Sequence, residues 1–121
     1  MQNAINWFEI FVADLDRASR FYQSALAIEL RREDFGGTPM AIFPADREGT
    51  GGALVKDGKR QPGGAGALVY LNANGKLDAV LDRVPRAGGA VVLPKTDIGQ
   101  PGFIATVRDS EGNLVGLHSE R

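Results

Sequence analysis

The chain has 121 residues, of which 43% are hydrophobic and 24% charged, which suits one folded domain and argues against disorder. Its formal net charge is −1, and its basic residues are spread among acidic ones, so nothing favours a nucleic-acid partner. The absence of cysteine removes disulfides, thiolate nucleophiles and sulfur metal ligands.

No apolar run approaches the roughly 18 residues that a membrane span needs, and the first residues lack the basic and apolar regions of a signal peptide. We therefore expect a cytoplasmic protein with no membrane segment.

The chain begins with a predicted strand at residues 5–12, where β-branched and aromatic side chains mix. Side chains alternate between the two faces of a strand, so Trp7, Glu9 and Phe11 are expected on one face. A carboxylate between two large aromatics is unusual on a face that is merely packed, which makes Glu9 a candidate for function.

A helix and three short strands complete the first half. Asp14 suits a helix N-cap, and apolar residues recur after it at helical spacing as far as Leu26. Glycine- and proline-bearing turns separate the strands that follow, which we expect at 29–33, 40–43 and 52–55.

The second half repeats this order after a segment without hydrophobic period, residues 57–64. A strand is expected at 67–72, and then a helix that ends near Val84 because Pro85 cannot donate the next helical hydrogen bond. Three further strands are expected at 91–93, 102–107 and 113–119. A turn at 109–113 joins the last two.

This duplication predicts an α+β fold made of two βαβββ modules, residues 4–56 and 65–120, within one domain spanning 1–121. A glycine- and proline-rich linker joins them. Two such units pair to bury their sheet faces, which predicts a curved mixed sheet around a cup-shaped cavity where a ligand binds.

Three sequence segments carry a family resemblance. They are VADLDRASRFY at 12–22, RAGGAV at 86–91 and DSEGNLVGL at 109–117. In this order, and with the βαβββ repeat, the chain resembles the vicinal oxygen chelate superfamily of glyoxalases, bleomycin resistance proteins and extradiol dioxygenases. The resemblance implies two modules around a cup and assembly as a homodimer.

Metal-dependent members, as the resemblance implies, hold a divalent ion through His, Glu or Gln from four strands. The matching positions here are Trp7, Leu68 and Gly116, with the fourth near Ala53 or Leu54. None of these side chains offers an oxygen or imidazole ligand. We therefore expect no metal and no other cofactor, which puts in doubt the family activities that need the ion.

Seven residues remain as candidates for the site. Strand alternation keeps Glu9 and His118 on the face of the lost ligand positions, and both side chains can move protons, so they are the catalytic candidates. The candidates for ligand contact, mostly aromatic, are Trp7, Phe11, Phe43, Tyr70 and Asn72.

The competing interpretation gives each of these side chains a structural role. The aromatics would fill the core or a dimer interface, and Glu9 would form a hydrogen bond to Tyr70, Asn72 or Arg108. His118 would be an ordinary strand residue near the end of the chain.

Four functional hypotheses follow. The first is a metal-independent protein that binds a small organic molecule in the cup, with Glu9 pairing a polar or cationic group. The second is a metal-free lyase or isomerase in which Glu9 acts as acid or base, assisted by His118 or Tyr70. The third is a metal-dependent enzyme similar to lactoylglutathione lyase, and the fourth is a subunit of a larger assembly. Whether a homodimer would exchange modules or dock complete monomers stays open.

Overall fold

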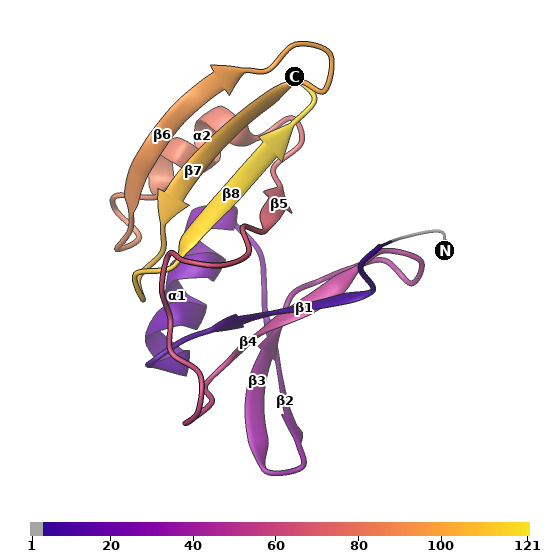
Figure 1. The fold of residues 1–121 in the computed structure, drawn as a ribbon, viewed down its shortest axis with the longest axis vertical. Coiled ribbons are helices and arrows are strands. Elements are labelled where there is room, and N and C mark those ends of the chain that lie inside the picture. The colour runs from indigo at the N-terminus through magenta and orange to yellow at the C-terminus, as the bar shows by residue number, and fades with distance from the viewer. Residues whose placement is uncertain (1–3) are drawn as a thin grey trace.

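The computed structural model describes residues 4–121 and shows the two expected βαβββ modules (Figure 1). The first module consists of β1 (Trp7–Phe11), α1 (Leu15–Leu26), β2 (Arg31–Phe35), β3 (Thr38–Ile42) and β4 (Gly51–Val55). The second consists of β5 (Tyr70–Asn72), α2 (Leu77–Arg83), β6 (Ala90–Asp97), β7 (Phe103–Arg108) and β8 (Leu114–Ser119). The predicted α+β class and its duplication are confirmed.

Residues 1–3, on which the expected absence of a signal peptide partly depends, lie outside the described residues. In the part of the chain that the structure describes, no helix is both long and apolar enough to cross a membrane.

Each module forms its own four-stranded sheet. The strand orders are β1-β4-β3-β2 and β5-β8-β7-β6. β1 lies parallel to β4 and β5 lies parallel to β8, whereas the other neighbouring strands are antiparallel. Both β1 and β5 are therefore edge strands, and each leaves one side of its backbone unpaired within its sheet.

Helix α1 follows the signals in its sequence. The Asp14 carboxylate accepts a hydrogen bond from the backbone N–H of Arg17 at 3.0 Å, as an N-cap does. The helix ends at Ala27, which adopts a left-handed conformation with φ 55°. One apolar stripe of the helix is buried, and Tyr22 on that stripe is only 2% exposed.

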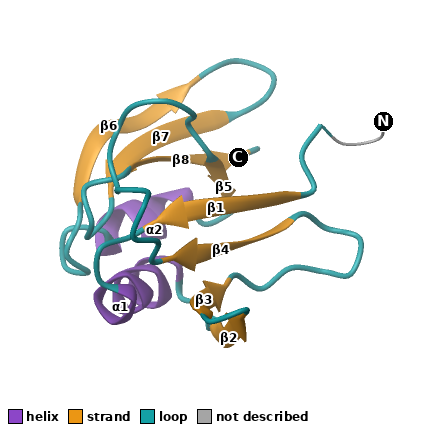
Figure 2. Cartoon of the chain, turned by 60° about the horizontal axis from the view of Figure 1, so that its bottom comes forward, coloured by secondary structure: helices purple, strands orange, loops and turns teal. Residues whose placement is uncertain are grey.

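One hydrophobic core joins the two modules. It takes in both helices and the helix-facing sides of both sheets. The helices lie next to each other (Figure 2). The Arg83 guanidinium at the end of α2 donates to the carbonyl of Ala25 in α1 at 3.0 Å. The modules therefore meet through their helical sides, and the opposite face of each sheet lies outside this core.

Several strand boundaries differ from the prediction, among them those of β2, β5 and β6. β2 begins at Arg31, not at residue 29, because the Gln23 side chain accepts the N–H of Leu30 at 3.0 Å and keeps the preceding residues against helix α1. β5 begins at Tyr70, three residues later than expected. β6 is longer than expected because its pairing with β7 continues through two register shifts around Leu93.

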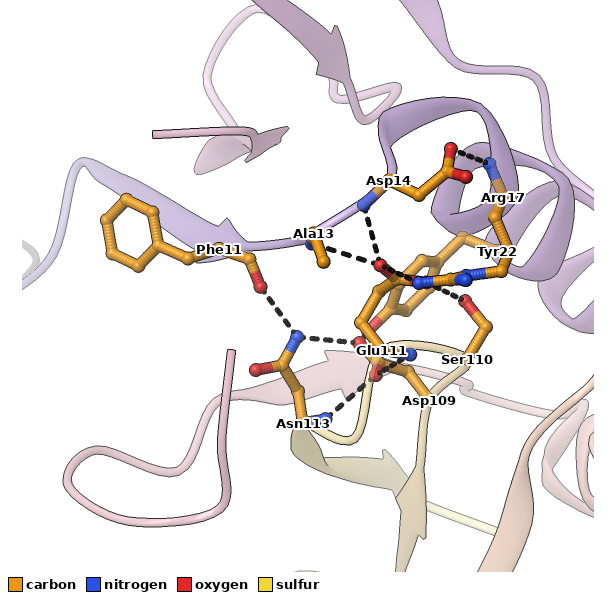
Figure 3. A network of polar contacts seen from close by, with 9 residues as sticks. All are labelled: Phe11, Ala13, Asp14, Arg17, Tyr22, Asp109, Ser110, Glu111 and Asn113. Atoms are coloured by element: carbon orange, nitrogen blue, oxygen red, sulfur yellow. Dashed lines mark hydrogen bonds and ion pairs between the residues drawn. The ribbon is translucent and has the colours of Figure 1, made fainter. Parts of the chain in front are cut away.

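A polar network fastens the β7–β8 turn to the start of helix α1 (Figure 3). The Glu111 carboxylate accepts the backbone N–H groups of Ala13 at 3.0 Å and Asp14 at 2.8 Å, and it pairs with Arg17 at 2.6 and 2.9 Å. The Ser110 hydroxyl donates a further hydrogen bond at 3.0 Å. These bonds, with that from Arg17 the largest, lower the pKa of Glu111 to about 2.

The same turn reaches deeper through Asp109, whose carboxylate accepts the Tyr22 hydroxyl at 2.6 Å and the Asn113 amide at 2.9 Å. Asn113 also donates to the carbonyl of Phe11 at 2.8 Å and accepts the N–H of Gly63 at 2.7 Å. Burial, with the nearby Asp109 charge, raises the pKa of Tyr22. We refer to Asp109, Glu111 and Asn113 with these partners as the module latch.

Candidate functional site

The outer face of β1 carries an aromatic side chain paired with a carboxylate. The Trp7 indole N–H donates to Glu9 Oε2 at 3.2 Å, and Trp7 is 42% exposed. Its ring lies over Gly51 on the neighbouring strand, since a Cβ on that glycine would stand 3.3 Å from it. Strand alternation thus places Trp7 and Glu9 side by side, as predicted.

Glu9 does not form the structural hydrogen bond that the competing interpretation gives it. Its side chain is exposed. Its hydrogen-bond partner is Trp7 on the same strand, and not Tyr70, Asn72 or Arg108. Because Oε1 accepts no hydrogen bond from any residue that the structure describes, one carboxylate oxygen is available to a ligand.

Phe11, on the same face, is covered by the linker. The Arg60 guanidinium lies 5.4 Å from the centre of the Phe11 ring and forms an ion pair with Asp57 at 2.8 Å. Glu9 and Phe11 line a hollow of about 460 Å³ together with residues 61–64 of the linker and Ala65. The linker is therefore one wall of a candidate site as well as a connection.

The second module presents Tyr70, Asn72 and His118 around another hollow, of about 550 Å³. Tyr70 is 46% exposed, and its ring covers Gly116, where a Cβ would overlap it. His118 Nε2 lies 2.6 Å from the carbonyl oxygen of Pro101, so this nitrogen is the donor and holds the β6–β7 loop beside the hollow.

Phe43 lies elsewhere, in the core on the helix side of the first sheet. It is 8% exposed, and its ring centre lies 5.5 Å from those of Phe8 and Tyr22. Phe43 therefore packs in the core, and it also lines a hollow together with Trp7.

A single chain does not bring the remaining candidates into one hollow. Trp7 lines a third hollow, of about 630 Å³, beside Arg31 and Asp46. The separation follows from the packing of the modules through their helices, which leaves the candidate faces of β1 and β5 outside the shared core.

The duplication fixes which residues of the two modules are equivalent. After β1, the N–H of Val12 donates to the carbonyl of Val55 at 2.9 Å. After β5, the N–H of Ala73 donates to the carbonyl of His118 at 2.8 Å. Val12 is thus equivalent to Ala73, and Val55 to His118.

Counting back from these anchors makes Trp7 equivalent to Leu68, and Ala53 equivalent to Gly116. These are the positions at which the family resemblance expects metal ligands, and Ala53 is now preferred over Leu54 as the fourth. None of the four side chains has a ligand atom, so they do not fit a metal ion. Across residues 4–121, no three His, Cys, Asp or Glu side chains gather as a metal site would require.

The fold and its outer faces define a class of protein with paired βαβββ modules, with Trp7 and Glu9 exposed on one outer face and Tyr70 exposed on the other. The model of the Glyoxalase/Bleomycin resistance protein/Dioxygenase superfamily matches residues 4–117. The chain therefore belongs to this superfamily.

Curated relatives include the putative glyoxylase CFP32 of Mycobacterium bovis and of Mycobacterium tuberculosis. Each is 28% identical over 121 residues, which cover 96% of this chain and 45% of the relative. The chain thus spans less than half the length of these relatives.

Solved structures share the fold over almost the whole chain. A glyoxalase/bleomycin resistance protein from Albidiferax ferrireducens T118 has a TM-score of 0.77 at 16% identity, covering 98% of this chain and 100% of its own. TnmS3, an antibiotic binding protein from Streptomyces sp. CB03234, has a TM-score of 0.71 at 24% identity, covering 98% and 97%. At these identities the likeness shows the fold alone.

The module latch was not predicted from the sequence. The sequence predicts residues 109–113 only as a hairpin turn, although the segment DSEGN is part of the family resemblance. The signal was a run of acidic and amide side chains in a turn, which could accept backbone donors from another module.

Proposed function

We propose that this protein binds a small organic molecule, without a metal ion, in a cup completed by a second copy of the chain. One observation carries the proposal: the four positions equivalent to metal ligands hold Trp7, Ala53, Leu68 and Gly116, while Glu9 beside them has one carboxylate oxygen that accepts no hydrogen bond from residues 4–121. Such a surface suits contact with a ligand better than coordination of an ion.

Edge strands support the second copy. β1 carries Trp7 and Glu9, β5 carries Tyr70, and each strand ends its sheet. If β1 of one copy lies beside β5 of another, the two outer faces combine, and Trp7 and Glu9 of one chain face Tyr70 and His118 of the other. Two copies in twofold symmetry would form two such cups, and each cup would draw one module from each chain.

The chemistry of these side chains favours a planar ligand with a positive charge. Trp7 offers the strongest aromatic face for a cation, and the Glu9 carboxylate beside it has one oxygen to which no described residue donates a hydrogen bond. The Arg60 guanidinium lies over the neighbouring Phe11 ring, and this contact supports the choice of a flat cation. The printed description of TnmS3 as an antibiotic binding protein is consistent with a binding role in this fold.

A thermal-shift screen tests the proposal, using planar compounds with and without a cationic group in buffer that contains EDTA. We expect cationic planar compounds to raise the melting temperature of the wild-type protein. In Glu9→Gln the affinity for the best cationic compound should fall about tenfold, while a neutral analogue of the same shape keeps its affinity.

Two variants sharpen the result. Trp7→Leu should weaken both compounds, because it removes the aromatic face. Glu48→Gln serves as the control, since it removes the same charge from an exposed loop residue. No stabilisation by any compound, or equal affinity in Glu9→Gln and wild type, would reject the proposed ligand chemistry.

A further inference from the structure

An apolar groove lies between the modules. It measures about 670 Å³ and is formed on one side by Phe8, Phe43 and Leu26 and on the other by strand β5 and Val80 of helix α2. Leu68, Tyr70 and Asn72 belong both to its lining and to the second-module face of the proposed cup. Among the residues that the structure describes, the lining includes neither Glu9 nor His118, so a ligand in the groove would be recognised without these two side chains.

The groove has the size and character of a ligand site. Binding cavities for small molecules generally measure about 300–1,000 Å³ and are mostly apolar with a few polar groups. The Phe8 and Phe43 rings lie in its wall. Their centres are 5.5 Å apart, and the angle between their planes is 41°. Leu68 and Ile5, which also line it, are 39% and 56% exposed, so solvent meets a large apolar surface.

One charge accompanies this apolar surface. Lys76 is the single charged residue among those described residues that line the groove, where Thr50 adds a hydroxyl. None of the ion pairs formed within residues 4–121 includes Lys76. An ammonium group without a carboxylate partner beside an apolar groove matches a molecule with an apolar body and one anionic head.

We propose that the groove between the modules binds elongated apolar carboxylates, with the hydrocarbon between Phe8, Phe43 and Val80 and the carboxylate paired with Lys76. The complementarity of charge selects this class over alcohols and amines of the same length. Because strand β5 lines both the groove and the hollow that contains His118, it forms a common wall between the two spaces.

Displacement of a fluorescent fatty acid, 11-(dansylamino)undecanoate, tests this inference on the whole chain. The competitors are decanoate, decanol and decylamine, which differ only in the head group. We expect decanoate to compete best and decylamine worst. In Lys76→Gln the affinity for decanoate should fall about fivefold or more, while that for decanol stays within about twofold.

Three further variants separate the possible causes. Ala67→Trp places an indole in the groove and should weaken both decanoate and decanol. Lys59→Gln, which removes the same charge from the exposed linker, should change neither. Glu9→Gln should also change neither, so failure of the proposed cup leaves this inference standing, and the reverse holds as well.

Several results would overturn the inference. They are the absence of displacement by any competitor, equal decanoate affinity in Lys76→Gln and wild type, and equal affinity for decanoate and decylamine. Sedimentation velocity adds one more outcome. If Ala67→Trp abolishes self-association and decanoate does not bind, the groove is a contact between copies of the chain and not a ligand site.

Discussion

Replacing Glu111 with glutamine tests how much the module latch contributes to stability. The folded state lowers the pKa of this carboxyl from 4.5 to about 2, and each tenfold change in proton affinity corresponds to about 1.36 kcal/mol. The upper bound on its contribution is therefore about 3.4 kcal/mol. Because its partner Arg17 is 49% exposed and solvent screens the pair, we expect Glu111→Gln to lower the free energy of unfolding by about 2 kcal/mol at pH 7.

The sign of the pH dependence follows from the direction of the shift. A carboxyl whose pKa is lower in the folded state stabilises the protein fully above its unfolded pKa, and this contribution disappears as the pH falls through the folded pKa. For Glu111 that range runs from 4.5 down to about 2. Urea denaturation at pH 7 and pH 3 should therefore show a difference between wild type and Glu111→Gln that shrinks by about half or more at pH 3.

The exposed control Glu48→Gln should leave the free energy of unfolding within about 0.5 kcal/mol of wild type at both pH values. An equal effect of Glu111→Gln at pH 7 and pH 3 would refute the electrostatic reasoning. So would an effect at pH 7 no larger than that of the control.

Three other outcomes follow from the described contacts. Tyr22→Phe removes the hydroxyl that donates to Asp109 at 2.6 Å, and thermal denaturation should show a loss of about 1–3 kcal/mol; a change within error would contradict this bond's role. Gly52→Ala places a Cβ against the Phe8 ring, and chemical denaturation should show a cost of about 1–3 kcal/mol, with unaltered stability as the contrary result. Trp7 is the single tryptophan, so a ligand in the proposed cup should change the intrinsic fluorescence, whereas binding with unchanged emission would place the ligand elsewhere.

Local sequence signals predicted most of the secondary structure. The N-cap at Asp14 and the stop before Pro85 depend on neighbouring residues, and both appear where expected. The alternation that placed Trp7 beside Glu9 also held, because it depends only on strand geometry. The predicted start of β2 was wrong because the Gln23 side chain holds the following segment against the helix. A glutamine in the sequence does not indicate that its side chain forms such a contact.

Long-range packing set the parts that could not be predicted. The bond between Tyr22 and Asp109 joins residues 87 positions apart and is one of the contacts between the modules. The packing of the modules through their helices leaves Trp7 and Tyr70 lining different hollows of one chain. The periodicity of a sequence identifies the face of a strand or helix on which a side chain lies. It does not identify the element of the other module that packs against that face.

Complementation between two weakened variants tests the shared cup most directly. Trp7→Leu damages the first-module face, and Tyr70→Leu damages the second-module face, so each protein alone should bind the best planar cation in EDTA much more weakly than wild type. A mixed dimer would contain one cup with both changes and one cup with neither. If equal amounts assort at random, half of the dimers are mixed, and binding should return to about a quarter of the wild-type capacity. No recovery after mixing, or recovery only when a divalent metal replaces EDTA, would contradict a metal-free cup shared between two copies.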